Sequence, residues 1–200
     1  MPSNDRSFGW RTKREFFSAK DFLGMDNNGS SDISLSQGTP VMEAITTIEI
    51  CGIPMNAADE VQHFFPIPWD MDRNRPVRAR LFFQHASTDA DTPTFKFAYK
   101  FFEKQDGLVE IKGGADKDVS FDSHTCSTTA ASLEVTNWKD LSMEDYLTDD
   151  DVAVGVCVEL DALGSATADE CHLIGFELEW TVDAFDSYRH KTDTEPVNTV

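Results

Sequence analysis

Apolar and polar residues alternate along much of the second half of the chain, and a period of two predicts β-strands. Successive side chains of a strand point to opposite faces of a sheet, so an alternating segment can bury one face and expose the other. Four segments show this pattern clearly: residues 77–83, 95–101, 152–160 and 174–182. We therefore expect four strands, each with one face in a core.

Weaker strand signals lie between these segments, separated by residues typical of turns. They cover residues 41–51, 63–67, 108–112, 119–121 and 130–135. One helical turn is expected near residues 137–146. Many short strands with few helical patterns are typical of a closed or double-sheet antiparallel domain. The sequence therefore predicts an all-β fold, a jelly-roll-like antiparallel β-sandwich of about eight strands.

Composition supports one folded domain and limits its partners. The chain has 200 residues, of which 40% are hydrophobic and 15 are Phe, so it can bury a core without staples. Its net charge of −19 would repel phosphate backbones, which argues against nucleic-acid binding. No apolar run is long enough to cross a bilayer, and the N-terminus lacks the apolar stretch of a signal peptide. We expect cytoplasmic synthesis and no membrane association.

The start of the chain differs from the rest in charge. Residues 1–20 hold five basic residues against two acidic ones, and residues 26–40 are mostly polar. This organisation predicts an extended N-terminal arm over residues 1–40, a sandwich over residues 41–185 and a C-terminal tail over residues 186–200. Residues 10–22 contain no helix-breaking residue, which is compatible with one short helix.

The arm is rich in aromatic residues for a polar terminus. Aromatic and Arg side chains are the types that anchor protein interfaces, so we expect the arm to dock on a partner protein. The alternative is a solvated tail. The arm residues expected to bind are Phe8, Trp10, Arg11, Arg14, Phe16, Phe17 and Phe22.

A second group of candidate partner-binding residues consists of Arg73, Arg75, Arg78 and Arg80. Arg78 and Arg80 fall on the polar face of one predicted strand. Guanidinium groups pair well with carboxylates, so the stripe could meet an acidic surface, including a neighbouring copy of the chain. The alternative is that these arginines pair with acidic residues on an adjacent strand. The pattern leaves both interpretations open.

Candidate chemistry is sparse. The five His residues form no metal-binding pair, and no catalytic or nucleotide-binding motif occurs. His124 lies two residues before Cys126, but no third group orients such a pair. The four Cys residues are spaced too irregularly for a disulfide framework and are expected to be free thiols. The acidic run 149–151, like Asp89 and Asp91, is interpreted as solvated loop in preference to a Ca²⁺ site. We predict no enzyme, no cofactor and no metal.

Two segments resemble a β-sandwich module of virion structural proteins of tailed phages, including head decoration proteins and capsid spikes. The first begins with Phe-Phe-Pro-Ile-Pro-Trp-Asp at residues 64–70 and continues through strands 77–83 and 95–99. The second, residues 168–180, is similar to the closing strand of that module. The resemblance covers roughly residues 60–184. It implies a non-enzymatic unit on the exterior of the virion, made in the host cytoplasm, and it carries over no catalytic residues.

These observations lead to one functional hypothesis and two alternatives. The chain is expected to decorate or cement a phage capsid, with the arm binding the major capsid protein or neighbouring copies in a homo-oligomer, most simply a trimer. Deleting residues 1–38 is then expected to leave a folded sandwich that no longer binds capsids. A glycan-binding module of a head or tail fibre is the first alternative, with Trp69 or Trp138 stacking on sugar rings. A metal-dependent enzyme is the second. If Trp69 has a structural role instead, it covers one end of the core.

Overall fold

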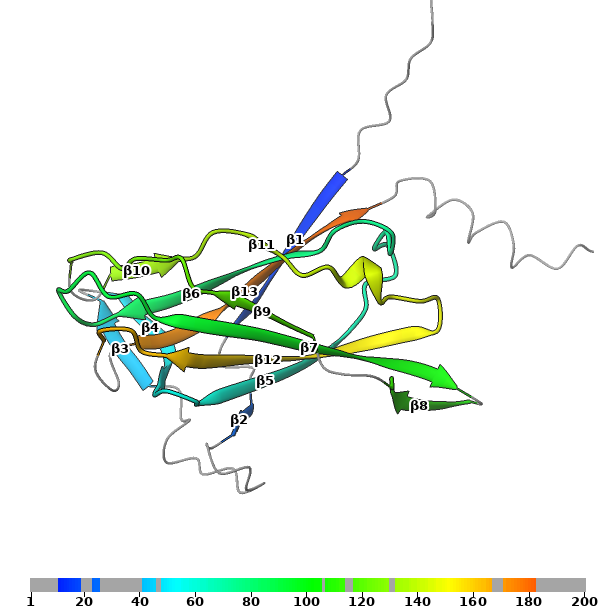
Figure 1. Ribbon diagram of the computed structural model, residues 1–200, viewed down its shortest axis with the longest axis horizontal. Coiled ribbons are helices and arrows are strands. Elements are labelled where there is room, and N and C mark those ends of the chain that lie inside the picture. The colour runs from blue at the N-terminus through cyan, green and yellow to red at the C-terminus, as the bar shows by residue number, and fades with distance from the viewer. Residues whose placement is uncertain are drawn as a thin grey trace, which may run out of the picture.

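The structure is a computed structural model that describes residues 11–18, 23–25, 41–45, 48–105, 107–113, 117–129, 132–166 and 171–182. Within these residues two antiparallel sheets pack face to face (Figure 1). The seven-stranded sheet contains β1 (Arg11–Ser18), β3 (Val41–Ile45), β4 (Ile48–Met55), β6 (Arg78–His85), β10 (Ser132–Val135), β11 (Lys139–Asp140) and β13 (Cys171–Val182). The six-stranded sheet contains β2 (Leu23–Met25), β5 (Glu60–Pro66), β7 (Thr94–Gln105), β8 (Leu108–Ile111), β9 (Lys117–Phe121) and β12 (Asp151–Ala162).

The strand order confirms the predicted jelly-roll-like sandwich. The seven-stranded sheet runs β10-β6-β13-β4-β3, with β1 also paired to β13 and β11 to β6. The six-stranded sheet runs β2-β5-β12-β7-β8, with β9 also paired to β7. Most neighbours in these sheets are distant in sequence, so the chain crosses repeatedly between the two layers. All four clearly predicted strands are present, as β6, β7, β12 and β13, and the weaker signals at residues 63–67, 108–112, 119–121 and 130–135 correspond to β5, β8, β9 and β10. Residues 41–51, expected as one strand, contain β3 and the start of β4, which pair with each other.

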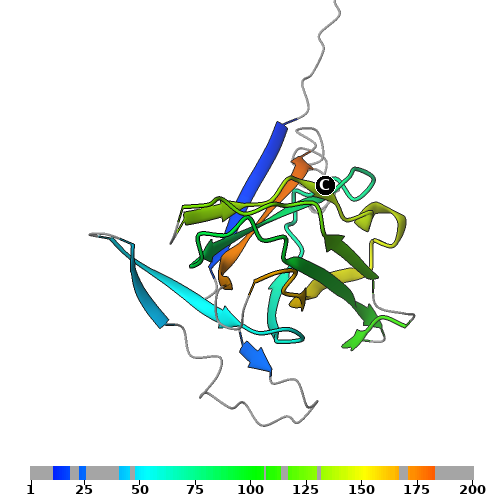
Figure 2. The ribbon, with the colours of Figure 1, turned by 60° about the vertical axis from the view of Figure 1, so that its left-hand side comes forward.

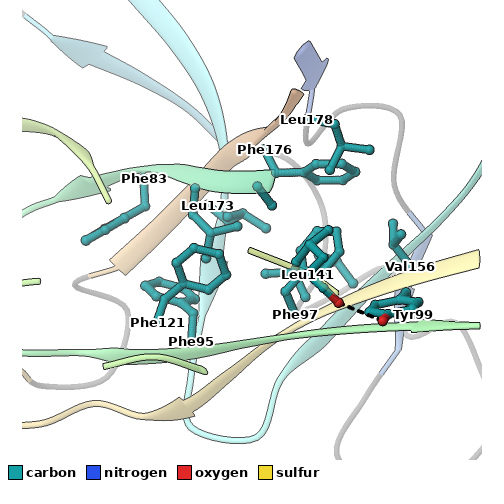
Figure 3. Close-up of a cluster of buried hydrophobic side chains, with 14 of the residues drawn as sticks. Phe83, Phe95, Phe97, Tyr99, Phe121, Leu141, Val156, Leu173, Phe176 and Leu178 are labelled. Atoms are coloured by element: carbon teal, nitrogen blue, oxygen red, sulfur yellow. Dashed lines mark hydrogen bonds between the residues drawn. The ribbon is translucent and has the colours of Figure 1, made fainter. Parts of the chain in front are cut away.

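The core lies between the sheets and is built largely from Phe rings (Figure 3). Phe83 and Phe95 pack with ring centroids 5.0 Å apart, and Phe97 packs edge-on against Phe176 at 5.1 Å. These contacts join strands of opposite sheets, and aromatic pairs of this geometry stabilise beyond their buried area. The Tyr99 hydroxyl donates a 2.7 Å hydrogen bond to the carbonyl oxygen of Leu141, so this buried phenol is satisfied. Burial also raises the pKa of Tyr99.

Two β-bulges change which residues face the core. In β13 the pairing with β6 shifts between Leu173 and Gly175, so Leu173 is buried before the bulge and Phe176 after it. Simple alternation along residues 174–182 assigned Ile174 to the core, and this residue is only half-buried. In β12 a shift between Asp151 and Ala153 leaves Val152 exposed, although the sequence pattern placed it inside. A bulge cannot be read from alternation because it consists of one extra residue that breaks the period.

The segment predicted as part of an arm, with one possible helix, is strand β1. Arg11–Ser18 pairs antiparallel with β13 along its whole length, from Arg11 opposite Val182 to Ser18 opposite Gly175. Figures 1 and 2 both show β1 in blue lying beside β13 in orange. The helix prediction is wrong here because an available sheet edge outweighs the weak local helix preference.

Phe17 ties β1 to the core. Its ring stacks on Phe176 with centroids 4.8 Å apart and also contacts Phe65 at 4.6 Å and His63 at 5.4 Å. Phe176 belongs to one sheet and Phe65 and His63 to the other, so the ring bridges both layers. Residues 11–18 are therefore part of the sandwich, and a single arm does not extend to residue 40. A deletion of residues 1–38 would remove β1 and β2, so we no longer expect it to leave the fold intact.

Other sequence predictions have simple outcomes. The helical turn expected near residues 137–146 is a 3-10 turn, η2 (Met143–Asp145). Cys126, Cys157 and Cys171 form no disulfide. In the described part of the chain, no helix has the length and apolar character needed to span a membrane. The predicted arm residues Phe8, Trp10 and Phe22 and the predicted tail 186–200 lie outside the described residues.

Two neighbouring residues of β1 offer a direct test of this packing. Phe17→Ala should lower the free energy of unfolding by about 2–4 kcal/mol because it removes a ring that contacts both sheets. Phe16→Ala, on the opposite face of the same strand, should cost about 1 kcal/mol or less. Urea denaturation followed by fluorescence measures both. Equal losses for the two variants would contradict the assignment of Phe17 to the core.

Candidate protein-binding face

The outer surface of the seven-stranded sheet carries a cluster that we call the arginine–aromatic face. Its residues come from β1, β6, β13 and the segment after β10: Arg14, Phe16, Arg78, Arg80, Phe82, Trp138, Glu177 and Glu179. In the sheet register, Glu179 lies opposite Arg14 on one side and Arg78 on the other. Glu177 likewise lies between Phe16 and Arg80. Directly opposed residues share a face of the sheet, so these side chains form two rows across three strands.

Each carboxylate in these rows is paired with guanidinium groups. Nε of Arg14 donates to Oε2 of Glu179 at 2.7 Å, and Arg78 donates to Oε1 of the same carboxylate. Nε of Arg80 donates to Oε2 of Glu177 at 2.6 Å. Hydrogen bonds between ionised groups are the stronger class in proteins. The rows therefore help to hold β1 and β6 on either side of β13.

The carboxylate of Glu179 and the guanidinium groups that pair with it differ in solvent exposure. The side chain of Glu179 is only 3% exposed, whereas those of Arg14 and Arg78 are 54% and 49% exposed. The carboxylate lies beneath the guanidinium groups, and the guanidinium groups form the outer layer. A molecule approaching this face meets positive charge, although the whole chain carries −19.

Trp138 organises the outer layer. The guanidinium carbons of Arg14, Arg78 and Arg80 lie 5.3, 5.8 and 4.6 Å from the centroid of its ring. A cation over an aromatic face is attracted by the ring quadrupole, and Arg stacks particularly well. The indole therefore limits the freedom of three long side chains before any partner binds.

Phe16 adds an apolar element beside the arginines. It is 48% exposed and meets Phe82 edge-on at a centroid distance of 5.3 Å. Phe82 lies opposite Gly175 in the register, and a Cβ atom on this glycine would come within 2.2 Å of the Phe17 carbonyl oxygen and 2.8 Å of the Phe16 ring. Glycine at this position allows β1 to approach β13 closely, and Phe16 then covers the space that a side chain would fill.

The electrostatics of Glu179 follow from this arrangement. Burial alone would raise the pKa of this carboxyl group, but the hydrogen bonds and charges of Arg14 and Arg78 outweigh burial and hold the pKa below its ordinary value. The carboxylate is therefore charged at neutral pH. The link between β1, β6 and β13 is then a true ion-pair network.

The structure brings together some of the residues that the sequence singled out and separates others. Arg14 and Phe16 from the predicted arm meet Arg78 and Arg80 from the body on one face. Arg78 and Arg80 pair with glutamates of the adjacent strand, as one of the two interpretations of this stripe expects. That the stripe also meets an acidic surface of a partner stays a prediction. The sequence did not single out Glu177 and Glu179 as their partners, although the two acids fall on alternate residues of a predicted strand.

The remaining residues predicted to bind a partner lie outside the arginine–aromatic face. Arg73 donates to the carbonyl oxygens of Thr148 and Asp151, the latter at 2.9 Å, and so braces a loop. Arg75 lies 3.7 Å from Asp72 in an exposed ion pair. Arg11 is an exposed residue at the start of β1, and Phe17 is partly buried and packs against the core.

The groups considered for catalysis have structural partners. His124 Nε2 lies 2.9 Å from Oε2 of Glu134, and Oε1 of the same carboxylate accepts hydrogen bonds from the Ser132 hydroxyl and the Ser127 amide. Burial, followed by the nearby charge of Cys171, raises the pKa of Cys126 to about 12, so this thiol is not a ready nucleophile.

The acidic residues considered for Ca²⁺ binding point inward in two cases. Asp151 is fully buried and accepts hydrogen bonds from Lys112 at 2.7 Å and from the Thr148 amide at 2.7 Å. Asp91 is buried with His85, whose Nε2 lies 2.9 Å from the Asp91 carboxylate. Among the residues that the structure describes, no group of three or more acidic, His or Cys side chains is placed to hold a metal ion.

The two Trp residues proposed for sugar stacking lie in different surroundings. Trp69 is 77% exposed, so the interpretation that it covers one end of the core is wrong. The two Pro residues around Ile67 direct the chain outward at the end of β5 and leave the indole at the surface. Trp138 is half-buried beneath the three guanidinium groups. Its ring is therefore already occupied by cations.

Comparison with known proteins identifies no family for this chain. No family model and no curated protein matches the sequence. Among solved structures, a carbohydrate-binding module of family 28, specific for non-crystalline cellulose, is similar at 9% identity and a TM-score of 0.34, over 72% of this chain and 78% of that chain. A family 61 carbohydrate-binding module solved with β-1,4-galactotriose is similar at 12% identity and 0.31, over 84% and 86%.

A third similar structure is a chain of infectious bursal disease virus, strain Gx, at 12% identity and a TM-score of 0.35. The match covers 87% of this chain but only 32% of the viral chain. Since identity and TM-score are low in all three cases, we draw no functional conclusion from these neighbours.

The ion-pair network predicts a specific dependence of stability on pH. Glu179→Gln should lower the free energy of unfolding at pH 7 by about 1–3 kcal/mol, because it removes the charge from the hydrogen bonds to Arg14 and Arg78. Since the folded-state pKa of Glu179 lies below its unfolded value, this stabilisation is present above the unfolded value and is lost as pH falls through the folded one. The difference between wild type and variant should therefore shrink between about pH 5 and pH 3.

Urea denaturation at a series of pH values measures this difference. Glu110→Gln, which changes an exposed residue of β8, is the control and should stay within about 0.5 kcal/mol of wild type throughout. A Glu179→Gln deficit that is the same at pH 7 and pH 3 would show that the network contributes through packing and not through charge.

Proposed function

We propose that this protein is a non-enzymatic structural protein of a tailed-phage virion that decorates or cements the exterior of the capsid. The observation that carries the proposal is the arginine–aromatic face, which gathers Arg14, Phe16, Arg78 and Arg80 around Trp138. The resemblance of residues 60–184 to virion β-sandwich modules supplies the biological setting.

The composition of the face fits a protein interface. Trp, Phe and Arg are the residue types that dominate binding energy at interfaces, and they do so best when they are held rigidly before binding. Here the arginines are held by the carboxylates of Glu177 and Glu179 and by the Trp138 indole beneath them, so little conformational entropy remains to be lost on docking. The two carboxylates of the face, Glu177 and Glu179, are held in ion pairs with its arginines, which supports a role in binding.

The charge of the face indicates the kind of partner. The outward layer is positive on a chain that is otherwise strongly acidic, so the complementary surface is an acidic patch of another protein. The major capsid protein of the virion is the proposed partner. Neighbouring copies of this chain are a second proposed contact, since their remaining surface is acidic, and a closed homo-oligomer such as a trimer would repeat the contact.

The location of the protein in the particle provides the first test. Antibodies against the purified protein, detected by immunogold electron microscopy on intact virions of the phage that encodes it, should label the head. Virions without label, or label confined to the tail, would overturn the capsid assignment.

Binding to capsid shells tests the face itself. Wild-type protein should co-sediment with shells assembled from the major capsid protein, and the double variant Phe16→Ala/Arg78→Ala should bind about tenfold more weakly or worse, because it removes one aromatic and one cationic anchor. Added NaCl should weaken the wild-type interaction. Arg75→Ala, which changes an arginine away from the face, is the matched control. Equal binding by the double variant and wild type would exclude this face as the capsid contact.

A further inference from the structure

The six-stranded sheet has a groove on its outer face, on the opposite side of the sandwich from the arginine–aromatic face. Two adjoining hollows, of about 340 and 390 Å³, share the residues Gln62, Ala98 and Cys157. They therefore form one continuous depression along β5, β12 and β7, three strands that lie side by side (Figure 1). We call it the outer groove.

Small residues create the groove. Gly155 on β12 lies opposite Phe64 on β5 and Lys100 on β7, and Cys157 lies opposite Gln62 and Ala98. A Cβ atom on Gly155 would come within 3.2 Å of the Phe102 ring, so the edge of that ring lies close beside the glycine and forms a wall of the groove. The floor is low in the middle of the sheet because Gly and Ala leave little side chain above the backbone.

The two ends of the groove differ in chemistry. At one end, Phe64 and Phe102 meet edge-on with ring centroids 5.0 Å apart, and Phe64 is 56% exposed. At the other end the lining is polar and charged, and it consists of Glu60, Gln62, Lys96, Asp118 and Glu159. The groove therefore has an aromatic surface at one end and hydrogen-bond donors and acceptors at the other.

The position of the groove limits what can bind there. β12 pairs with β5 on one side and with β7 on the other, so the backbone N–H and C=O groups beneath the groove are committed to the sheet. An extended peptide that binds by adding a strand needs a free sheet edge. A ligand in the outer groove has to be recognised by side chains, through stacking and through hydrogen bonds.

A sugar meets both requirements, because a pyranose ring presents C–H groups on its faces and hydroxyl groups around its rim. Carboxylates accept hydrogen bonds from hydroxyl groups, and Gln and Lys side chains donate to them. The charged lining contains three carboxylates, those of Glu60, Asp118 and Glu159, against the two cations Lys96 and Lys100, and Lys96 is also paired with Asp161. This balance disfavours acidic sugars.

We propose that the outer groove binds a short neutral oligosaccharide, with Phe64 as the stacking platform and the polar end as the hydrogen-bonding site. The site uses the sheet opposite to the arginine–aromatic face, so it is independent of the proposed capsid contact. A capsid protein with such a groove could hold the virion on a glycan-bearing cell surface through many weak copies acting together.

Isothermal titration calorimetry with the full chain tests this site. The probes are neutral cello-, malto-, manno-, galacto- and chito-oligosaccharides, with sialyllactose and an oligogalacturonate as acidic comparators. At least one neutral probe should bind with a measurable heat, and the acidic probes should not. Binding of acidic probes alone, or of no probe at millimolar concentration, would overturn the proposal.

Two variants locate the binding. Phe64→Ala should weaken binding of the neutral probe at least about tenfold, and Ala98→Leu should do the same by filling the floor from an outward-facing position. Leu108→Ala, which changes an exposed apolar residue outside the groove, is the matched control and should bind like wild type. Circular dichroism confirms that each variant is folded.

The variants also separate this site from the capsid contact. Arg78→Ala should leave the affinity for the oligosaccharide unchanged. Unchanged affinity in both Phe64→Ala and Ala98→Leu would place any sugar site elsewhere and refute the assignment to the groove, whatever the outcome of the capsid-binding experiment.

Discussion

Strand β13 is the element on which the rest of the structure depends. It pairs with β6 on one side and with β4 and then β1 on the other, so most of its backbone groups bond to neighbouring strands. Its inner face supplies Phe176, Leu178 and Trp180 to the core, and its outer face supplies Glu177 and Glu179 to the ion-pair rows. The period of two along one strand therefore builds both the interior and the arginine–aromatic face.

The N-terminal strand has a similar double role. Phe17 is held between the two sheets, and the neighbouring Phe16 and Arg14 are presented on the outside. Docking of β1 and formation of the arginine–aromatic face are thus one event, since Arg14 reaches Glu179 only when β1 lies beside β13. A segment that looks like a separate clamp in the sequence is a structural strand whose outer face carries the binding residues.

The two outer faces of the sandwich suit different partners for a physical reason. On the seven-stranded sheet, long side chains stand above buried carboxylates and give a raised, cationic surface suited to another protein. On the six-stranded sheet, Gly155 and Ala98 leave the surface hollow between aromatic and polar walls. The difference arises from the size of the outward-facing side chains, because both sheets have the same kind of backbone.

Much of this protein was determined by local sequence pattern. Alternation over residues 77–83, 95–101 and 152–160 predicted the strands and nearly all of their buried residues, because side-chain direction in a strand depends only on the period. The arginine pair 78 and 80 was also visible as an outward-facing stripe. The tertiary structure alone decided the features that depend on contacts between distant residues. Residues 11–18 form a strand, and bulges in β12 and β13 change which residues face the core. Trp138 lies under three guanidinium groups, and Phe64 and Phe102 line a hollow. Each of these depends on which strands become neighbours, and pairing between residues as far apart as Arg14 and Glu179 leaves no periodic mark in the sequence.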